Sequence, residues 1–231
     1  MILRAVAARW NREVSLDKRR TATPAADDAE VGRQRSTLRH EIAIAFPVAV
    51  VLWLATYYFL PPLSGMDDTL TRLFFDLKCC CVAILFCFLT GIEPVAHERL
   101  RCPAIDPLSG YETRRMEINL RYLQNTLEQL ILFVPGLLGL AIFCSNGSMR
   151  AVAATTLVWI VSRIAFWVGY HCGSQHRALG APGALQTMPV LLYVCARFGF
   201  QIAGVAGAIT VLVLFGFAEV LLVRATRPID P

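Results

Sequence analysis

Five stretches of this chain contain no charged residue, and they constrain its fold more than any other feature. These apolar stretches are residues 42–66, 79–92, 129–149, 178–196 and 198–218. A helix needs about 20 mainly apolar residues to cross a bilayer. Only 17% of the 231 residues are charged, against about 25% in a soluble domain. The sequence therefore predicts an all-α integral membrane protein, with the lipid bilayer as its first partner and no nucleic-acid partner, and it excludes an ordinary soluble fold.

The eight cysteines do not form the framework of a secreted disulfide-rich domain. Half of them stand in one apolar run, between Cys79 and Cys87, and cysteine is often buried as an apolar residue. Lipidation of Cys102 is an alternative for that residue. His171, Cys172 and His176 are too few ligands for a closed zinc site, so we expect no metal.

Six membrane spans are the preferred organisation. Residues 1–41 hold 15 of the 39 charges and are predicted to be a disordered cytosolic tail; the acid-free start, Met1–Trp10, also resembles a transit peptide. The last apolar stretch is too long for one helix, so we divide it at Arg197–Gly199 into a hairpin. Five spans is the alternative, if Pro189 marks a half-inserted segment. The predicted spans are residues 42–63, 73–96, 119–143 and 151–172, followed by two within 181–223.

The basic residues predict the orientation. With the N-terminus inside, 17 basic residues flank the spans on the cytosolic side and four (Arg72, Lys78, Arg150 and Arg197) on the other. Because positive residues are enriched in cytosolic segments, we expect both termini to be cytosolic.

One group of polar residues lies inside the third predicted span. Arg121, Asn125 and Glu128 are spaced by four and three residues, so they share one face of a helix. Ionisable side chains at bilayer depth are costly and are therefore functional candidates. The structural alternative is a polar clamp between helices.

A second group follows in the next span. Steps of seven residues place Arg163, Tyr170 and Arg177 near one stripe, if the helix stays straight. Tyr170 and Arg177 are also typical of interfacial anchors. Arg163 is about ten residues from either end of its span and needs a carboxylate or a ligand; Glu128 is predicted at a similar depth. A transporter gated by these two residues is a further hypothesis.

The two patterns, R-x-x-x-N-x-x-E and R-x6-Y-x6-R, resemble the family of membrane-associated proteins in eicosanoid and glutathione metabolism (MAPEG). The resemblance covers residues 73–197 and implies a homotrimer of four-helix bundles that binds glutathione between subunits, in the endoplasmic reticulum or another endomembrane. Residues 42–63 would then be an added N-terminal span, and 198–231 an added C-terminal span with a short cytosolic tail. Glu117-Ile-Asn-Leu-Arg-Tyr122 and Ser162-Arg163 are most similar to the mattrin branch, which is linked to the epidermal barrier.

The resemblance also implies roles for single residues. Arg121, Asn125, Glu128, Arg163 and Tyr170 would bind glutathione, Arg177 would be catalytic by stabilising the thiolate, and Arg99 or Arg101 would belong to the basic pair that closes the preceding span. The chain departs from the pattern at Phe166, where a tyrosine is usual, and at Glu93-Pro94, which is expected to break the span that lines the lipophilic pocket.

Two functions follow from this resemblance. One is a microsomal-type glutathione transferase or peroxidase that acts on lipophilic electrophiles or lipid hydroperoxides. The alternative is a non-catalytic, mattrin-like membrane protein that supports vesicle or barrier function.

Overall fold

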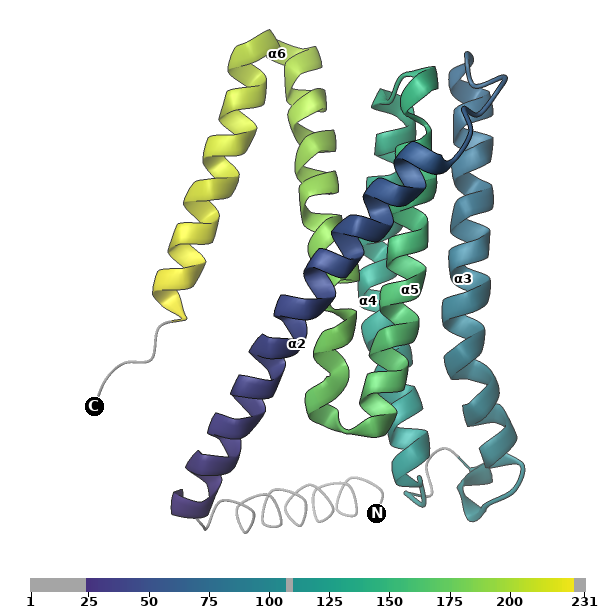
Figure 1. The fold of residues 1–231 in the computed structure, drawn as a ribbon, viewed down its shortest axis with the longest axis vertical. Coiled ribbons are helices and arrows are strands. Elements are labelled where there is room, and N and C mark those ends of the chain that lie inside the picture. The colour runs from purple at the N-terminus through teal and green to yellow at the C-terminus, as the bar shows by residue number, and fades with distance from the viewer. Residues whose placement is uncertain (1–23, 107–109, 227–231) are drawn as a thin grey trace, which may run out of the picture.

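The computed structural model describes residues 24–106 and 110–226, and every regular element among them is a helix (Figure 1). Five of these helices are long and apolar enough to cross a membrane, which confirms the all-α membrane class. The long helices are α2 (Pro24–Phe59), α3 (Thr69–Arg99), α4 (Arg114–Phe143), α5 (Arg150–Cys172) and α6 (Ala181–Ala225). Three short 3₁₀ segments connect them: η1 (Pro103–Ile105), η2 (Asn146–Ser148) and η3 (Ser174–Gly180).

The first helix, α2, begins at Pro24 rather than at Ile42. The prediction of a disordered tail is therefore wrong for residues 24–41, while residues 1–23 lie outside the described residues. Proline is compatible with the first position of a helix, because its φ is already helical and its missing N–H has no partner there. The helix ends at Phe59, shortly before Pro61 and Pro62, since the residue before a proline disfavours the helical conformation.

Side-chain caps set the start of the next two helices. Asp68 accepts hydrogen bonds from the backbone N–H groups of Leu70 (3.0 Å) and Thr71 (3.3 Å), and Thr113 accepts one from Met116 (3.2 Å) at the start of α4. Helix α3 continues through Pro94 to Arg99. The predicted break at Glu93-Pro94 is therefore wrong, because a proline removes only one backbone bond and membrane helices tolerate that loss.

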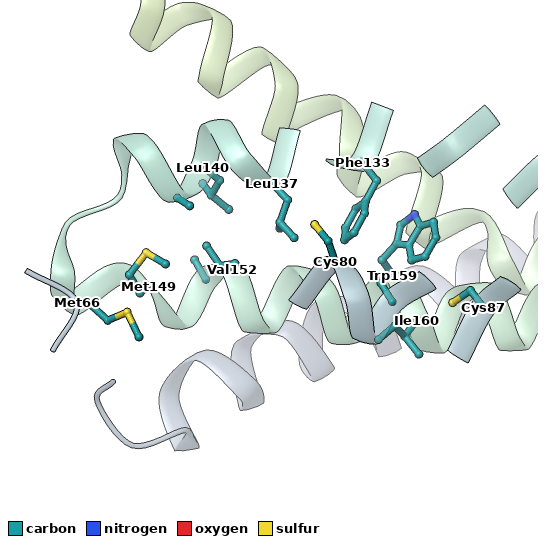
Figure 2. Close-up of a cluster of buried hydrophobic side chains, with 13 residues drawn as sticks. Met66, Cys80, Cys87, Phe133, Leu137, Leu140, Met149, Val152, Trp159 and Ile160 are labelled. Atoms are coloured by element: carbon teal, nitrogen blue, oxygen red, sulfur yellow. The ribbon is translucent and has the colours of Figure 1, made fainter. Parts of the chain in front are cut away.

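Helices α3, α4, α5 and the first part of α6 pack around one apolar core, and α2 crosses the face made by α5, η3 and α6 (Figure 1). In the core, the rings of Phe133 and Trp159 are stacked with centroids 4.5 Å apart. Leu137 and Val152 are fully buried in the same cluster, and Val152 lies next to Met149 (Figure 2). The Trp53 indole N–H donates to the Thr155 hydroxyl at 3.0 Å. This bond attaches α2 to α5 within the membrane-spanning part.

The last helix, α6, folds back on itself (Figure 1). Ala203 and Gly204 leave helical geometry, and Gly204 has a φ of +59°. The hairpin is thus present, but its turn lies at residues 203–204 rather than at Arg197–Gly199. Arg197 stays helical, with its guanidinium 5.7 Å from the ring centroid of Phe143. Helix α6 also continues through Pro189.

The turn in α6 provides a test of the backbone argument. Gly204→Ala should lower the free energy of unfolding by about 1–2 kcal/mol, because an L-residue is strained at positive φ. A Cβ at this position would contact nothing within 4 Å, so packing would not contribute. Unfolding of the detergent-solubilised protein would measure the change.

Gly216→Ala in the same helix is the matched control, since it also meets open space but has an ordinary φ. It should be neutral or slightly stabilising. Equal losses in both variants would contradict the argument.

Candidate functional site

A polar cavity lies between α4, α5 and η3. It has a volume of about 290 Å³ and is lined by Arg121, Gln124, Asn125, Glu128, Phe166, Tyr170 and Arg177. A second cavity of about 650 Å³ shares Arg121, Gln124 and Tyr170 with it and extends along the start of α4, beside Glu112, Arg114 and Glu117. The structure therefore brings together five residues predicted for the site: Arg121, Asn125, Glu128, Tyr170 and Arg177.

Helix periodicity explains the α4 side of the cavity. Arg121, Asn125 and Glu128 lie on one face of α4, and Arg121 and Glu128 are exposed while Asn125 is half-buried. Glu128 accepts a hydrogen bond from the side-chain amide of Gln124 at 3.2 Å. The face thus presents a cation and an anion at its rim and an amide deeper in.

Arg163 lies behind this face and is only 1% exposed. Its Nη1 donates to Oδ1 of Asn125 at 2.7 Å, and its Nη2 donates to the Gly180 carbonyl at 3.1 Å. The guanidinium also lies 4.7 Å from the ring centroid of Phe166. The predicted pairing of Arg163 with Glu128 is wrong, because the Glu128 carboxylate lies at the exposed rim. The hypothesis of a transporter gated by that pair loses its basis.

Two glycines without a Cβ allow η3 to pack directly against α5. A Cβ at Gly169 would lie 2.2 Å from the His176 carbonyl oxygen, and a Cβ at Gly180 would lie 2.7 Å from the Ser162 carbonyl oxygen. Helix α5 ends at Cys172. Arg177 is therefore not on one helical stripe with Arg163 and Tyr170, as the spacing predicted, but on a segment that folds back over the helix.

Several residues of the site region were not predicted from the sequence. Gln129 donates to Oδ1 of Asn125 at 3.2 Å. The fully buried Asn119 accepts from the Trp167 indole at 2.8 Å, and its Oδ1 lies 3.2 Å from Nε2 of His171. The sequence could have indicated Gln129 and Asn119, because both are polar residues within the apolar helix α4.

Asp76 is another polar residue within a span that was not predicted as functional. It is fully buried within α3, and the Cys80 thiol donates to its Oδ2 at 3.8 Å. A lone carboxyl within a span is itself a functional signal, but Asp76 lines none of the cavities described here.

The two remaining predicted residues lie elsewhere in the chain. Arg101 lines a separate cavity of about 920 Å³, whose apolar part is formed by Leu85, Phe86 and Leu89 of α3 and whose polar part includes Glu98 and Arg115. Arg99 lines none of these cavities, and its Nε has no hydrogen-bond partner within the described residues. Within one chain, neither arginine reaches the cavity of Arg177.

These features define an all-helical membrane protein with a polar cavity at one end of its bundle. The chain belongs to the MAPEG family, whose family model matches residues 78–200. The comparisons with curated proteins and with solved structures found no match. The match begins within α3 and ends within the first part of α6, so it includes every residue of the 290 Å³ cavity and leaves out α2.

The bond between Arg163 and Asn125 can be tested through stability. Asn125→Ala should lower the free energy of unfolding by about 2–3 kcal/mol, because a buried charged donor loses its partner. Glu128→Ala, on the same face but exposed, should stay within about 0.5 kcal/mol of the unchanged protein. Thermal unfolding in detergent would measure both changes. A larger loss for Glu128→Ala than for Asn125→Ala would indicate that Arg163 pairs with Glu128 after all.

Proposed function

We propose that the chain binds glutathione in the 290 Å³ cavity and uses it as a co-substrate against lipophilic electrophiles or lipid hydroperoxides. The observation that carries this proposal is the meeting of Arg121, Glu128 and Arg177 around one cavity in a member of the MAPEG family. This charge set matches a peptide that has two carboxylates, an ammonium and a thiol.

Each group has a physical role in this proposal. Arg121 and Arg177 bind the carboxylates and the thiolate, because guanidinium groups form charge-assisted hydrogen bonds with anions. Glu128 binds the ammonium. Asn125 already accepts hydrogen bonds from Arg163 and Gln129 on its oxygen, so its amide N–H groups are the donors that it offers to a ligand.

The reaction requires glutathione as a thiolate. The Arg177 guanidinium favours the anion, and the sulfur then attacks the electrophilic carbon while the leaving group departs with its electron pair. With a hydroperoxide, the thiolate attacks the outer oxygen and becomes a sulfenic acid, while the O–O bond breaks and the alkoxide leaves with the electron pair and takes up a proton to form the alcohol. The thiol of a second glutathione then displaces water from the sulfenic acid and forms the disulfide. Tyr170 adds a hydroxyl at the cavity, whereas Phe166 supplies none.

Oligomerisation is part of the same proposal. The cavity has an exposed rim formed by Arg121, Glu128 and Arg177, and a neighbouring subunit of a homotrimer would cover it with its Arg99 or Arg101. The cavity beside Leu85, Phe86 and Leu89 would hold the lipophilic co-substrate, since it combines apolar walls with a polar end. We place the protein in the endoplasmic reticulum or another endomembrane, as the family resemblance implies. Both termini are cytosolic in this proposal, because 17 of the 21 flanking basic residues then lie on the cytosolic side.

A non-catalytic, mattrin-like role is the second candidate. The observation that favours it is Phe166, which lines the cavity without the hydroxyl expected there. The helix α2, which lies outside the family match, also favours divergence from an enzyme.

Glutathione binding decides between these candidates. Calorimetric titration of the detergent-purified protein should give saturable binding with a Kd in the millimolar range or tighter. Arg121→Ala should weaken binding by about tenfold or more, the loss of roughly one charge-assisted contact. Arg224→Ala, at the end of α6 and outside the cavity, is the matched control. Folded, oligomeric protein that shows no saturable binding would leave the non-catalytic role.

Catalysis is tested separately from binding. Arg177→Ala should reduce conjugation of a model aryl halide by about 10²-fold, a typical loss for one electrostatic donor, while the Kd for glutathione changes less. Phe166→Tyr should keep or raise the rate. Turnover that is unaffected in Arg177→Ala would remove the thiolate-stabilising role from this arginine.

A further inference from the structure

The helix outside the family match contacts the segment that carries Arg177. Glu41 of α2 and His176 of η3 are 135 positions apart in the chain, yet Oε1 of Glu41 contacts Nδ1 of His176. The contact is an ion pair when the imidazole is protonated and a hydrogen bond when Nδ1 of a neutral imidazole carries the proton. His176 directly precedes Arg177 in η3.

The Glu41 side of this contact is buried. Glu41 is only 8% exposed, and its second oxygen has no hydrogen-bond partner within the described residues. A buried carboxylate without a partner is costly. The His176 contact therefore offsets part of the cost of burying Glu41, and it draws α2 towards η3.

The segment η3 depends on such contacts for its position. It is a 3₁₀ segment of seven residues, and 3₁₀ turns have weaker hydrogen-bond geometry than an α-helix. Its start is placed by Gly169 of α5 and by Glu41, and its end by the bond from Arg163 to the Gly180 carbonyl. Arg177 lies between these two attachments, and its side chain is exposed at the cavity.

We propose that Glu41 is a positioning residue: through His176, α2 determines where η3 presents the Arg177 guanidinium to the cavity. This inference rests on the proposed function and deepens it, because it assigns to an added helix the control of the group that stabilises the thiolate. A misplacement of about 1 Å at a reacting centre can cost up to about 10²-fold in rate. Turnover should therefore respond to Glu41 more strongly than binding does.

The experiment compares Glu41→Ala with His40→Gln, an exposed neighbour on the same helix. Glu41→Ala should lower kcat for conjugation of a model aryl halide by about tenfold and change the Kd for glutathione by less than about threefold. Glu41→Gln should recover part of the rate, since its amide oxygen can accept a hydrogen bond from Nδ1–H. His40→Gln should leave both quantities unchanged.

Double variants separate positioning from general destabilisation. His176→Ala should lower kcat at least as much as Glu41→Ala does, because it removes the Glu41 contact together with the other contacts of His176. Adding Glu41→Ala to His176→Ala should cause little further loss, because the contact that the two residues share is already absent. In an Arg177→Ala background, Glu41→Ala should have no additional effect on kcat. Hydrogen exchange of η3 should become faster in Glu41→Ala, and this measurement does not depend on turnover.

The possible failures are distinguishable. If the unchanged protein does not bind glutathione, the proposed function fails, and the positioning role in that reaction fails with it. If the unchanged protein is active and Glu41→Ala retains full kcat, only the positioning role is overturned. Equal additional losses of kcat in the presence and absence of Arg177 would also overturn it, because they would indicate a purely structural contribution.

Discussion

Arg163 is a cation with 1% of its surface exposed inside a bundle of membrane helices, and the site depends on how that charge is accommodated. Within the described residues its hydrogen-bond acceptors are neutral: the Asn125 amide oxygen on α4 and the Gly180 carbonyl at the end of η3. These two bonds satisfy Nη1 and Nη2 and offset part of the cost of burying the charge, while Nε has no hydrogen-bond partner within the described residues. Arg163 therefore connects three elements, and it sets both the orientation of the Asn125 amide and the place where η3 meets α5.

The accommodation of Arg163 also depends on close backbone approach. Gly169 and Gly180 leave no room for a Cβ against η3 and α5, so the short segment can lie directly on the helix. That packing brings Arg177 beside Tyr170 although α5 has already ended. The polar cavity is thus formed by a helix face on one side and a folded-back segment on the other. A cation on such a segment is moved by whatever contacts the segment, which is why the contact between Glu41 and His176 bears on function.

The family match and the structure together divide the chain. Residues 78–200 carry the match and contain the polar cavity, whereas α2 contributes a hydrogen bond from Trp53 to α5 and a contact from Glu41 to η3. Because α2 contacts η3 from outside the matched region, it is a position where members of one family can differ. It can alter the presentation of a functional group without changing the residues that line the cavity.

The sequence by itself determined the features that depend on local pattern. Charge-free apolar stretches require helices in a bilayer, and spacings of four and three residues place Arg121, Asn125 and Glu128 on one face whatever surrounds them. The two polar patterns were also sufficient to identify the family.

The tertiary structure alone decided the features that depend on distant residues. Asn125 rather than Glu128 binds Arg163, because depth and orientation are set by packing between helices. Helix α6 turns at Gly204 rather than at Arg197, because the Arg197 guanidinium packs over the Phe143 ring, while glycine tolerates a positive φ. Arg177 lines the cavity because η3 folds back over α5. Helical spacing in the sequence cannot predict this, because it depends on the close packing of α5 and η3 at Gly169 and Gly180.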